Sequence, residues 1–191
     1  MNWLNNIKIS RKLIAGFLLV ALIACAIGLV GYTSMKSIQQ SMMQVGKVYL
    51  PGIESLTSLK RSLEAILVGE RGLLIEGLKD DKRQAQYDYI NDAFATANTY
   101  WAIYDALPKT DELNGLWSAF QNDWAVWKTE HQKVVDLSLE KDQMIAGDAM
   151  ASSLQVTRFD EEILSANLNA RTYWLGLIET LNSMSEINNK L

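Results

Sequence analysis

The feature that most limits what this chain can fold into is an uncharged apolar segment near its N-terminus. Residues 13–30 carry no charged side chain, and their only polar group is the thiol of Cys25. At about 1.5 Å per residue, a helix of this segment is about 27 Å long, and the next two residues extend it. That length is enough to cross the hydrocarbon core of a bilayer. The sequence therefore predicts one transmembrane helix over residues 13–32.

The charges around this segment predict its orientation. Lys8, Arg11 and Lys12 stand just before it, and the first acidic residue is Glu54. Since positive charge is retained on the cytoplasmic side, residues 1–12 are predicted to lie in the cytoplasm. Residues 33–191 are then predicted to lie in the periplasm or outside the cell.

Two cleavage signals compete with a retained anchor. The sequence Ala24-Cys25-Ala26 has the form of a signal-peptidase site, and Leu22-Ile23-Ala24-Cys25 resembles a bacterial lipobox that would lipidate Cys25. Either cut predicts a polar, loose end after it. The chain instead stays apolar through residues 26–32 and continues into a helical pattern, so an uncleaved anchor is favoured over a lipoprotein or a cleaved protein.

Composition limits the rest of the chain to a helical, acidic domain. The 191 residues include 11 Gly and only 2 Pro, which suits a few long helices. One Cys allows no internal disulfide, and a single His excludes a zinc site of the usual Cys/His type. Beyond the anchor there are 15 basic and 22 acidic residues, a net charge of −7. We therefore expect no metal, no cofactor and no nucleic-acid partner.

Apolar residues recur at steps of three and four after the anchor and predict a long first helix over residues 32–78. Nine of the twelve positions in this stripe are apolar, which is typical of a coiled-coil face. Pro51 predicts a bend within it. The positions are Ile38, Met42, Val45, Tyr49, Gly52, Leu56, Leu59, Leu63, Ile66, Glu70, Leu73 and Gly77.

Three further apolar stripes predict helices over residues 80–107, 110–145 and 148–191. Thr110 is a candidate N-cap for the second of these. Gly147 suits a left-handed helix end and Asp148 suits the N-cap that follows. Short connections make sequential helices antiparallel neighbours. The predicted fold is all-α: a transmembrane helix continuing into an up-down-up-down four-helix bundle.

The third helix contains the aromatic-rich sequence "LWSAFQNDWAVW". Its rings fall on the apolar stripe, so a core of large side chains is favoured over a stacking platform or cofactor pocket. His131 lies on the same stripe and is interpreted as a hydrogen-bonded core residue rather than a haem ligand. The chain shows no nucleophile with a base, no phosphate-binding Gly-rich loop and no metal-ligand set, so no enzymatic activity is expected.

Three stretches resemble methyl-accepting chemotaxis receptors. They are "NIKISRKLIAGFLLVALIACAIGLVGYTSMKSI", "YLPGIESLTSLKRSLEAILVGERGLLIEG" with its "LP", and "AGDAMASSL" before the fourth helix. The resemblance implies the periplasmic sensor domain of a transducer in the bacterial inner membrane, dimeric through the first and fourth bundle helices. Such receptors return to the membrane, whereas this chain stops at "MSEINNKL", so a fragment is favoured. The same bundle also fronts histidine kinases and cyclic-dinucleotide enzymes.

The resemblance also implies a ligand site. In amino-acid-sensing members, arginines on the first helix hold the ligand carboxylate across the dimer interface, and a Gln-Pro-Thr segment on the fourth helix closes the site. Arg71 stands in the matching stretch "ERGLL", but Ser62 and Leu67 occupy the other two arginine positions. This departure disfavours an α-amino acid ligand.

Five residues are therefore candidates for binding a small anionic or amino-acid-like ligand, or a periplasmic binding protein. They are Arg61, Arg71, Gln155, Thr157 and Arg158. The alternative interpretation is that these arginines are solvated or paired with Glu64, Glu70 or Asp160. A sensor would move its first and fourth helices, with looser packing expected at Gly52, Glu70 and Gly77. The rival hypothesis is a membrane-anchored bundle that only dimerises or docks another protein.

Overall fold

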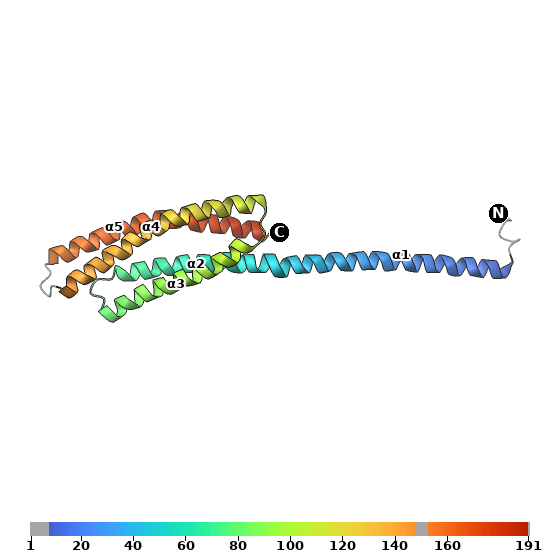
Figure 1. The fold of residues 1–191 in the computed structure, drawn as a ribbon, viewed down its shortest axis with the longest axis horizontal. Helices are drawn as coiled ribbons and strands as arrows, with labels where there is room; N and C mark the ends of the chain where they lie inside the picture. The colour runs from blue at the N-terminus through green and yellow to red at the C-terminus, as the bar shows by residue number, and fades with distance from the viewer. Residues whose placement is uncertain (1–7, 148–152, 191) are drawn as a thin grey trace. The chain divides into compact units, whose positions relative to one another are not determined.

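The computed structural model describes residues 8–147 and 153–190, which are helices joined by short connections (Figure 1). No strand occurs within these ranges. The chain divides into two compact units, residues 1–47 and 48–191, which are described separately. The all-α bundle predicted from the sequence is confirmed.

The first unit contains α1 (Ile9–Gln44), which buries none of its residues. Its apolar side chains are exposed, including Phe17, Leu22 and Leu29. Among the described residues, one helix is long and apolar enough to cross a membrane, and it is the one that begins at Ile9. A side-chain surface of this kind is stable in lipid rather than in water.

The junction at Pro51 differs from the simple bend predicted there. Helical residues are continuous from Ile9 to Leu73, and a π-helical turn, η2 (Val45–Tyr49), precedes α2 (Leu50–Leu73). Proline donates no backbone hydrogen bond and its ring crowds the carbonyl four residues earlier. A wider π-helical turn just before Pro51 accommodates both effects, because its hydrogen bonds skip one more residue.

The second unit adds α3 (Asp80–Ala106), α4 (Asp111–Gly147) and α5 (Ser153–Asn188). The Thr110 cap is confirmed, since Leu113 N–H donates to Thr110 Oγ1 at 3.3 Å. The first bundle helix ends at Leu73 rather than at 78. Gly77 lies in the turn that follows, where its φ is 67°, a conformation that glycine adopts without steric cost.

The end of α4 at Gly147 lies close to the predicted end at residue 145, but its conformation differs from the prediction. Gly147 was expected to end α4 in a left-handed conformation, but it is still helical, and Gly77 is the only described glycine with positive φ. Asp148, the predicted N-cap, lies outside the described residues.

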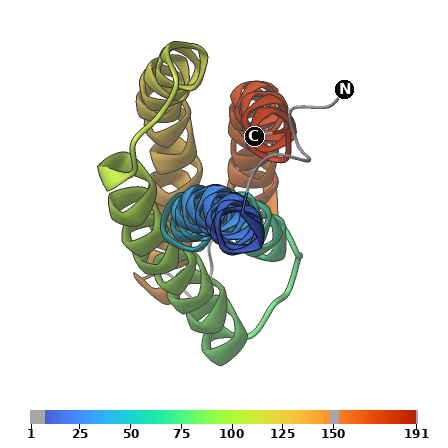
Figure 2. The same ribbon diagram turned by 90° about the vertical axis from the view of Figure 1, so that its right-hand side faces the viewer.

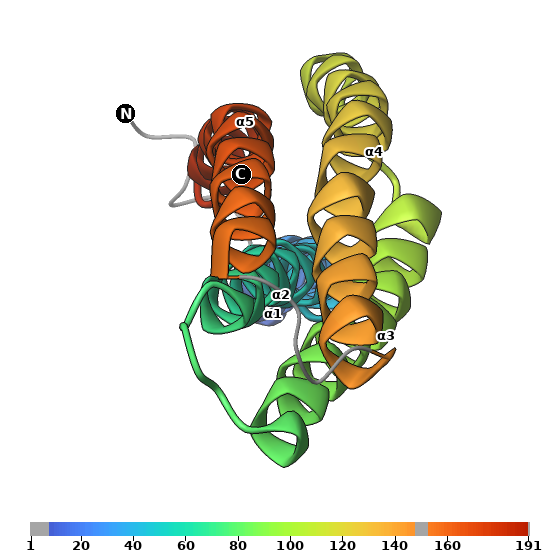
Figure 3. The ribbon, with the colours of Figure 1, turned by 90° about the vertical axis from the view of Figure 1, so that its left-hand side faces the viewer.

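The four bundle helices form two antiparallel pairs, α2 with α3 and α4 with α5, and α2 also packs on α5 (Figures 2 and 3). The α2–α3 turn lies at the same end of the bundle as the end of α4 and the start of α5 (Figure 1). We call this end the Gly77 end. The α3–α4 turn and the end of α5 lie at the opposite end.

Two kinds of contact set the distances between helices. A Cβ on Gly69 would lie 2.5 Å from Ile90 Cγ1, so the glycine lets α3 approach α2 closely. Between α3 and α4 the spacers are rings, with Phe94 5.8 Å from Trp127 and Trp101 4.7 Å from Trp117 between centroids. The aromatic segment of α4 is therefore core, as predicted.

Candidate functional site

A polar cluster lies inside the bundle core, next to the last turn of α2. Glu70 on α2 and His131 on α4 are only 1% and 3% exposed. Glu70 Oε1 lies 2.5 Å from His131 Nδ1, and Asn167 Nδ2 on α5 donates to Glu70 Oε2 at 2.8 Å. Both carboxylate oxygens thus have partners, and three helices share one hydrogen-bond network.

This network corrects two expectations about packing. Looser packing was expected at Glu70, but its carboxylate is buried and bonded on both oxygens. Gly52 is also tightly packed, since a Cβ there would lie 2.5 Å from Asn188 Nδ2. His131 is a hydrogen-bonded core residue, as interpreted from the sequence, and its ring lies 4.9 Å from that of Phe94. Buried polar groups of this kind fix one arrangement of the helices when all of them are satisfied.

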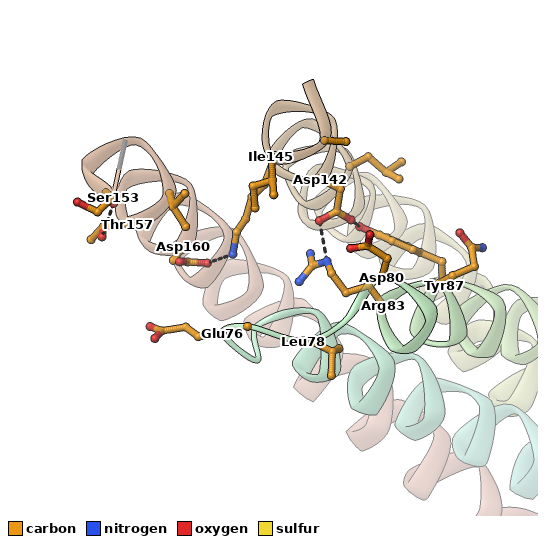
Figure 4. Close-up of a pocket in the computed structure, with 16 residues that line it drawn as sticks. Glu76, Leu78, Asp80, Arg83, Tyr87, Asp142, Ile145, Ser153, Thr157 and Asp160 are labelled. Carbon is orange, nitrogen blue, oxygen red and sulfur yellow. Dashed lines mark hydrogen bonds and ion pairs between the residues drawn. The ribbon is translucent and has the colours of Figure 1, made fainter. Parts of the chain in front are cut away.

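Two further charge pairs are found at the Gly77 end (Figure 4). Arg83 Nε on α3 lies 2.6 Å from Asp142 Oδ1 on α4, in the geometry of an ion pair rather than of an aligned hydrogen bond. Arg83 Nη1 donates to the Leu73 carbonyl at 3.1 Å, which ties α3 to the end of α2. Lys141 on α4 pairs with Asp160 on α5. The charges therefore connect all four bundle helices at this end.

Tyr87 contacts the same carboxylate as Arg83. Its hydroxyl donates to Asp142 Oδ2 at 2.7 Å. Burial, followed by the neighbouring Asp142 carboxylate, raises the pKa of Tyr87 far above its ordinary value. The phenol therefore stays protonated and remains a donor to Asp142 at all physiological pH values.

These pairs line a cleft of about 810 Å³ between the α2–α3 turn, α3, α4 and the start of α5. This volume is within the range of small-molecule sites. Its walls combine the charged side chains with apolar ones from Leu78, Leu139, Ile145 and Val156. Figure 4 shows Arg83 extending from α3 into this cleft and Asp160 on its opposite side.

The structure places the five predicted ligand residues on α2 and α5. Arg61 and Arg71 are exposed on α2. The other three, Gln155, Thr157 and Arg158, are exposed on α5 near its start. Of the five, Thr157 lines the cleft, where its hydroxyl donates to the Ser153 carbonyl at 2.9 Å.

Arg61, Arg71 and Arg158 are exposed, which agrees with the alternative interpretation that they are solvated. The acidic residues suggested as their partners have other partners where the structure describes them. Arg158 pairs with Glu162 at 2.8 Å, and Asp160 pairs with Lys141. Glu70 pairs with His131 rather than with an arginine.

Sequence reasoning missed Arg83, Lys141 and Asp142. Arg83 stands four residues before Tyr87, which begins the predicted stripe of the second helix, and Lys141 stands seven residues after Val134 on the third. The available signal was therefore a charged residue in register with an apolar stripe. Such a residue is expected to be buried and paired.

No group of three or more potential metal-ligating side chains occurs in the part of the chain that the structure describes.

Residues 6–191 match the model of a family described as a four helix bundle sensory module for signal transduction. No curated protein and no solved structure matches the chain. The family match and the apolar α1 together indicate a membrane-anchored protein. Because the match spans nearly all of the sequence and the bundle is present, the chain belongs to the family of four-helix-bundle sensory modules of methyl-accepting chemotaxis proteins.

Proposed function

We propose that this chain is the extracytoplasmic sensor region of a bacterial chemoreceptor, held in the inner membrane by α1. The observation that carries the proposal is the sensory-module match over residues 6–191, in a chain whose described residues contain one membrane-compatible helix, beginning at Ile9. The basic residues before that helix favour a cytoplasmic N-terminus, which leaves the bundle in the periplasm. The role is binding and signal transmission, without catalysis.

The outer faces of α2 and α5 support a homodimer. Leu164, Leu168 and Leu175 of α5 are about half exposed, and they follow one another at steps of four and seven residues. Val68 provides an exposed apolar side chain on α2. Heptad spacing of exposed leucines is the pattern of a helix that packs on another helix. The occupant we propose is a second copy of this chain.

The ligand is proposed to bind at this outer face near the Gly77 end. Arg71 lies in the last turn of α2, and Arg158 lies in the second turn of α5. Arginine guanidinium groups suit a carboxylate, because they donate two parallel hydrogen bonds. A small anion, an amino-acid-like molecule or a periplasmic binding protein fits this chemistry.

Transmission is proposed to occur by small shifts of α5 against α2. The two helices are held together by Trp174 Nε1, which donates to the Leu63 carbonyl at 3.1 Å, and by Lys60, which donates to Asn182 at 3.0 Å. A ligand that binds one packing of these helices more tightly shifts the population toward it. Packed helices move by shear steps of about 1–2 Å, and α5 would carry such a step toward the membrane.

A thermal-shift screen tests the direct-binding form of this proposal. The 191-residue chain in lipid nanodiscs is heated with organic acids and amino acids, and at least one is expected to raise its melting temperature. Arg71→Ala is expected to remove that shift. Lys128→Ala, at an exposed position on α4, is expected to retain it. If no compound raises the melting temperature, or if Arg71→Ala retains the shift, direct binding at this face is wrong.

Cysteine cross-linking tests the dimer face. The only native cysteine, Cys25, is first replaced by serine. Leu168→Cys is then expected to form a covalent dimer on mild oxidation, because leucine 168 faces its copy across the proposed interface. Tyr89→Cys, at a comparably exposed site on α3, is expected to stay monomeric on a denaturing gel. Equal cross-linking at both positions would contradict the proposed interface.

A further inference from the structure

We propose that the cleft at the Gly77 end is a second, intrasubunit binding site for a small carboxylate with an apolar body. It lies within one bundle, between α3, α4 and the start of α5. It is separate from the outer face of α2 and α5 on which the proposed function depends. Arg83 and Lys141 are the groups that receive the carboxylate.

The unsatisfied group in this cleft is a hydrogen-bond donor. The side chain of Arg83 is 9% exposed. Its Nη1 and Nε groups face Leu73 and Asp142, but Nη2 is buried without a hydrogen-bond partner among the described residues. A buried, unpaired guanidinium N–H is unfavourable, so a small rotation of the Arg83 side chain that presents Nη2 to a ligand oxygen in the cleft gains free energy.

The second buried cation reinforces the preference for an anion. The side chain of Lys141 is 5% exposed, and it reaches the cleft from α4. Arg83 and Lys141 thus approach the same cavity from two helix pairs. A carboxylate between them would receive charge-assisted hydrogen bonds from both.

The acidic residues of the cleft do not favour a cation instead. Asp142 accepts from Tyr87 and pairs with Arg83, and Asp160 pairs with Lys141. Glu76 and Asp80 are exposed at the rim, where water and salt screen their charge. The inner carboxylates therefore already have partners.

The apolar side chains that line the cleft predict the part of the ligand beyond its carboxylate. Leu78, Leu139, Ile145 and Val156 give the cleft an apolar surface on several sides. A ligand that places its carboxylate against Arg83 leaves its other end against these side chains. An aliphatic or aromatic ring of a few carbons fills that space, and its burial adds to the affinity.

Binding at this site would link the two halves of the bundle. Arg83 belongs to the α2–α3 pair, and Lys141 belongs to the α4–α5 pair. A bridging carboxylate would bring these pairs together at the Gly77 end. The site is therefore suited to modulate the same helix movement from inside the subunit.

The test uses three probes of one shape and different charge: benzoate, benzyl alcohol and benzylammonium. The full chain in nanodiscs is labelled with ¹³C at the methyl groups of Ile, Leu and Val. Benzoate is expected to shift the Ile145 signal, which reports on the cleft, without shifting Val68 on the outer face of α2. Benzyl alcohol is expected to bind at least about tenfold more weakly than benzoate, because a neutral hydroxyl replaces a charge-assisted contact.

Variants connect the shift to Arg83. Arg83→Met is expected to weaken benzoate binding about tenfold or more, which is about 1.4 kcal/mol. Because this change leaves Asp142 without its cation, the double variant Arg83→Met/Asp142→Leu is measured as well, and it is expected to show the same loss. Lys82→Met removes the neighbouring charge, which is 67% exposed and faces solvent, and is expected to bind benzoate as the wild type does.

Each other outcome overturns the inference. An unchanged Ile145 signal means that the cleft does not bind carboxylates. A benzoate shift confined to Val68 places the ligand on the outer face, and a stronger response to benzylammonium assigns the cleft a cation. If the double variant retains the Ile145 shift, Arg83 does not bind the carboxylate. None of these results depends on Arg71 or on cross-linking at residue 168, so failure here is distinguishable from failure of the proposed function.

Discussion

Replacing His131 by leucine is expected to lower the free energy of unfolding by about 3–5 kcal/mol, the cost of removing one partner from a buried pair. Glu70 is 1% exposed and would keep only the Asn167 contact of 2.8 Å. A buried carboxylate that has lost its charged partner is destabilised, because it is also removed from bulk solvent. Chemical unfolding followed by circular dichroism measures the loss.

The double variant Glu70→Leu/His131→Leu separates the lost partner from the lost packing. With the carboxylate removed as well, only Asn167 is left without its acceptor. The double variant is therefore expected to be more stable than His131→Leu alone, although less stable than the wild type. If the single and double variants unfold at the same denaturant concentration, the pair does not stabilise the core in the way described.

Replacing Trp127 by alanine is expected to lower the free energy of unfolding by about 3–5 kcal/mol. The side chain is 1% exposed, and its ring lies 5.0 Å from Trp124 and 5.6 Å from His131 between centroids. Its removal leaves a cavity at the place where rings separate α3 from α4. Loss of the near-ultraviolet circular dichroism signal at lower denaturant concentration would report this change.

The matched control is Tyr89→Ala on α3. Tyr89 is 46% exposed, and its removal creates no cavity in the core. The expected loss is therefore below about 1 kcal/mol. A loss equal to that of Trp127→Ala would show that aromatic area alone, and not its burial, determines the effect.

Most of the fold was predictable from the spacing of apolar residues. Leu56, Leu59, Leu63 and Ile66 are buried at the steps of three and four that predicted their helix. The same pattern does not predict burial in the part of the chain that lies outside the bundle. Ile38 belongs to the same stripe but is exposed in α1. A stripe shows which face of a helix is apolar, but it does not show whether protein or lipid covers that face.

The cleft was less predictable, since it depends on residues that break the pattern. Arg83 and Lys141 are charged, so a search for apolar spacing passes over them. Their burial depends on Asp142 and Asp160, which lie 59 and 19 residues away along the chain. A sequence specifies that such residues exist, but only the register of packed helices decides which charges meet. His131 was identified as a core residue, and its partner Glu70 was noticed only as an irregularity.

The unequal spacing of the helices implies which parts of the domain are able to move. Gly69 brings the backbones of α2 and α3 together, whereas large rings keep α3 apart from α4. Backbones in direct contact resist sliding, because each side chain is locked in its neighbour's groove. In the proposed signalling step we therefore expect α2 and α3 to move as one hairpin, with sliding across the layer of rings between α3 and α4.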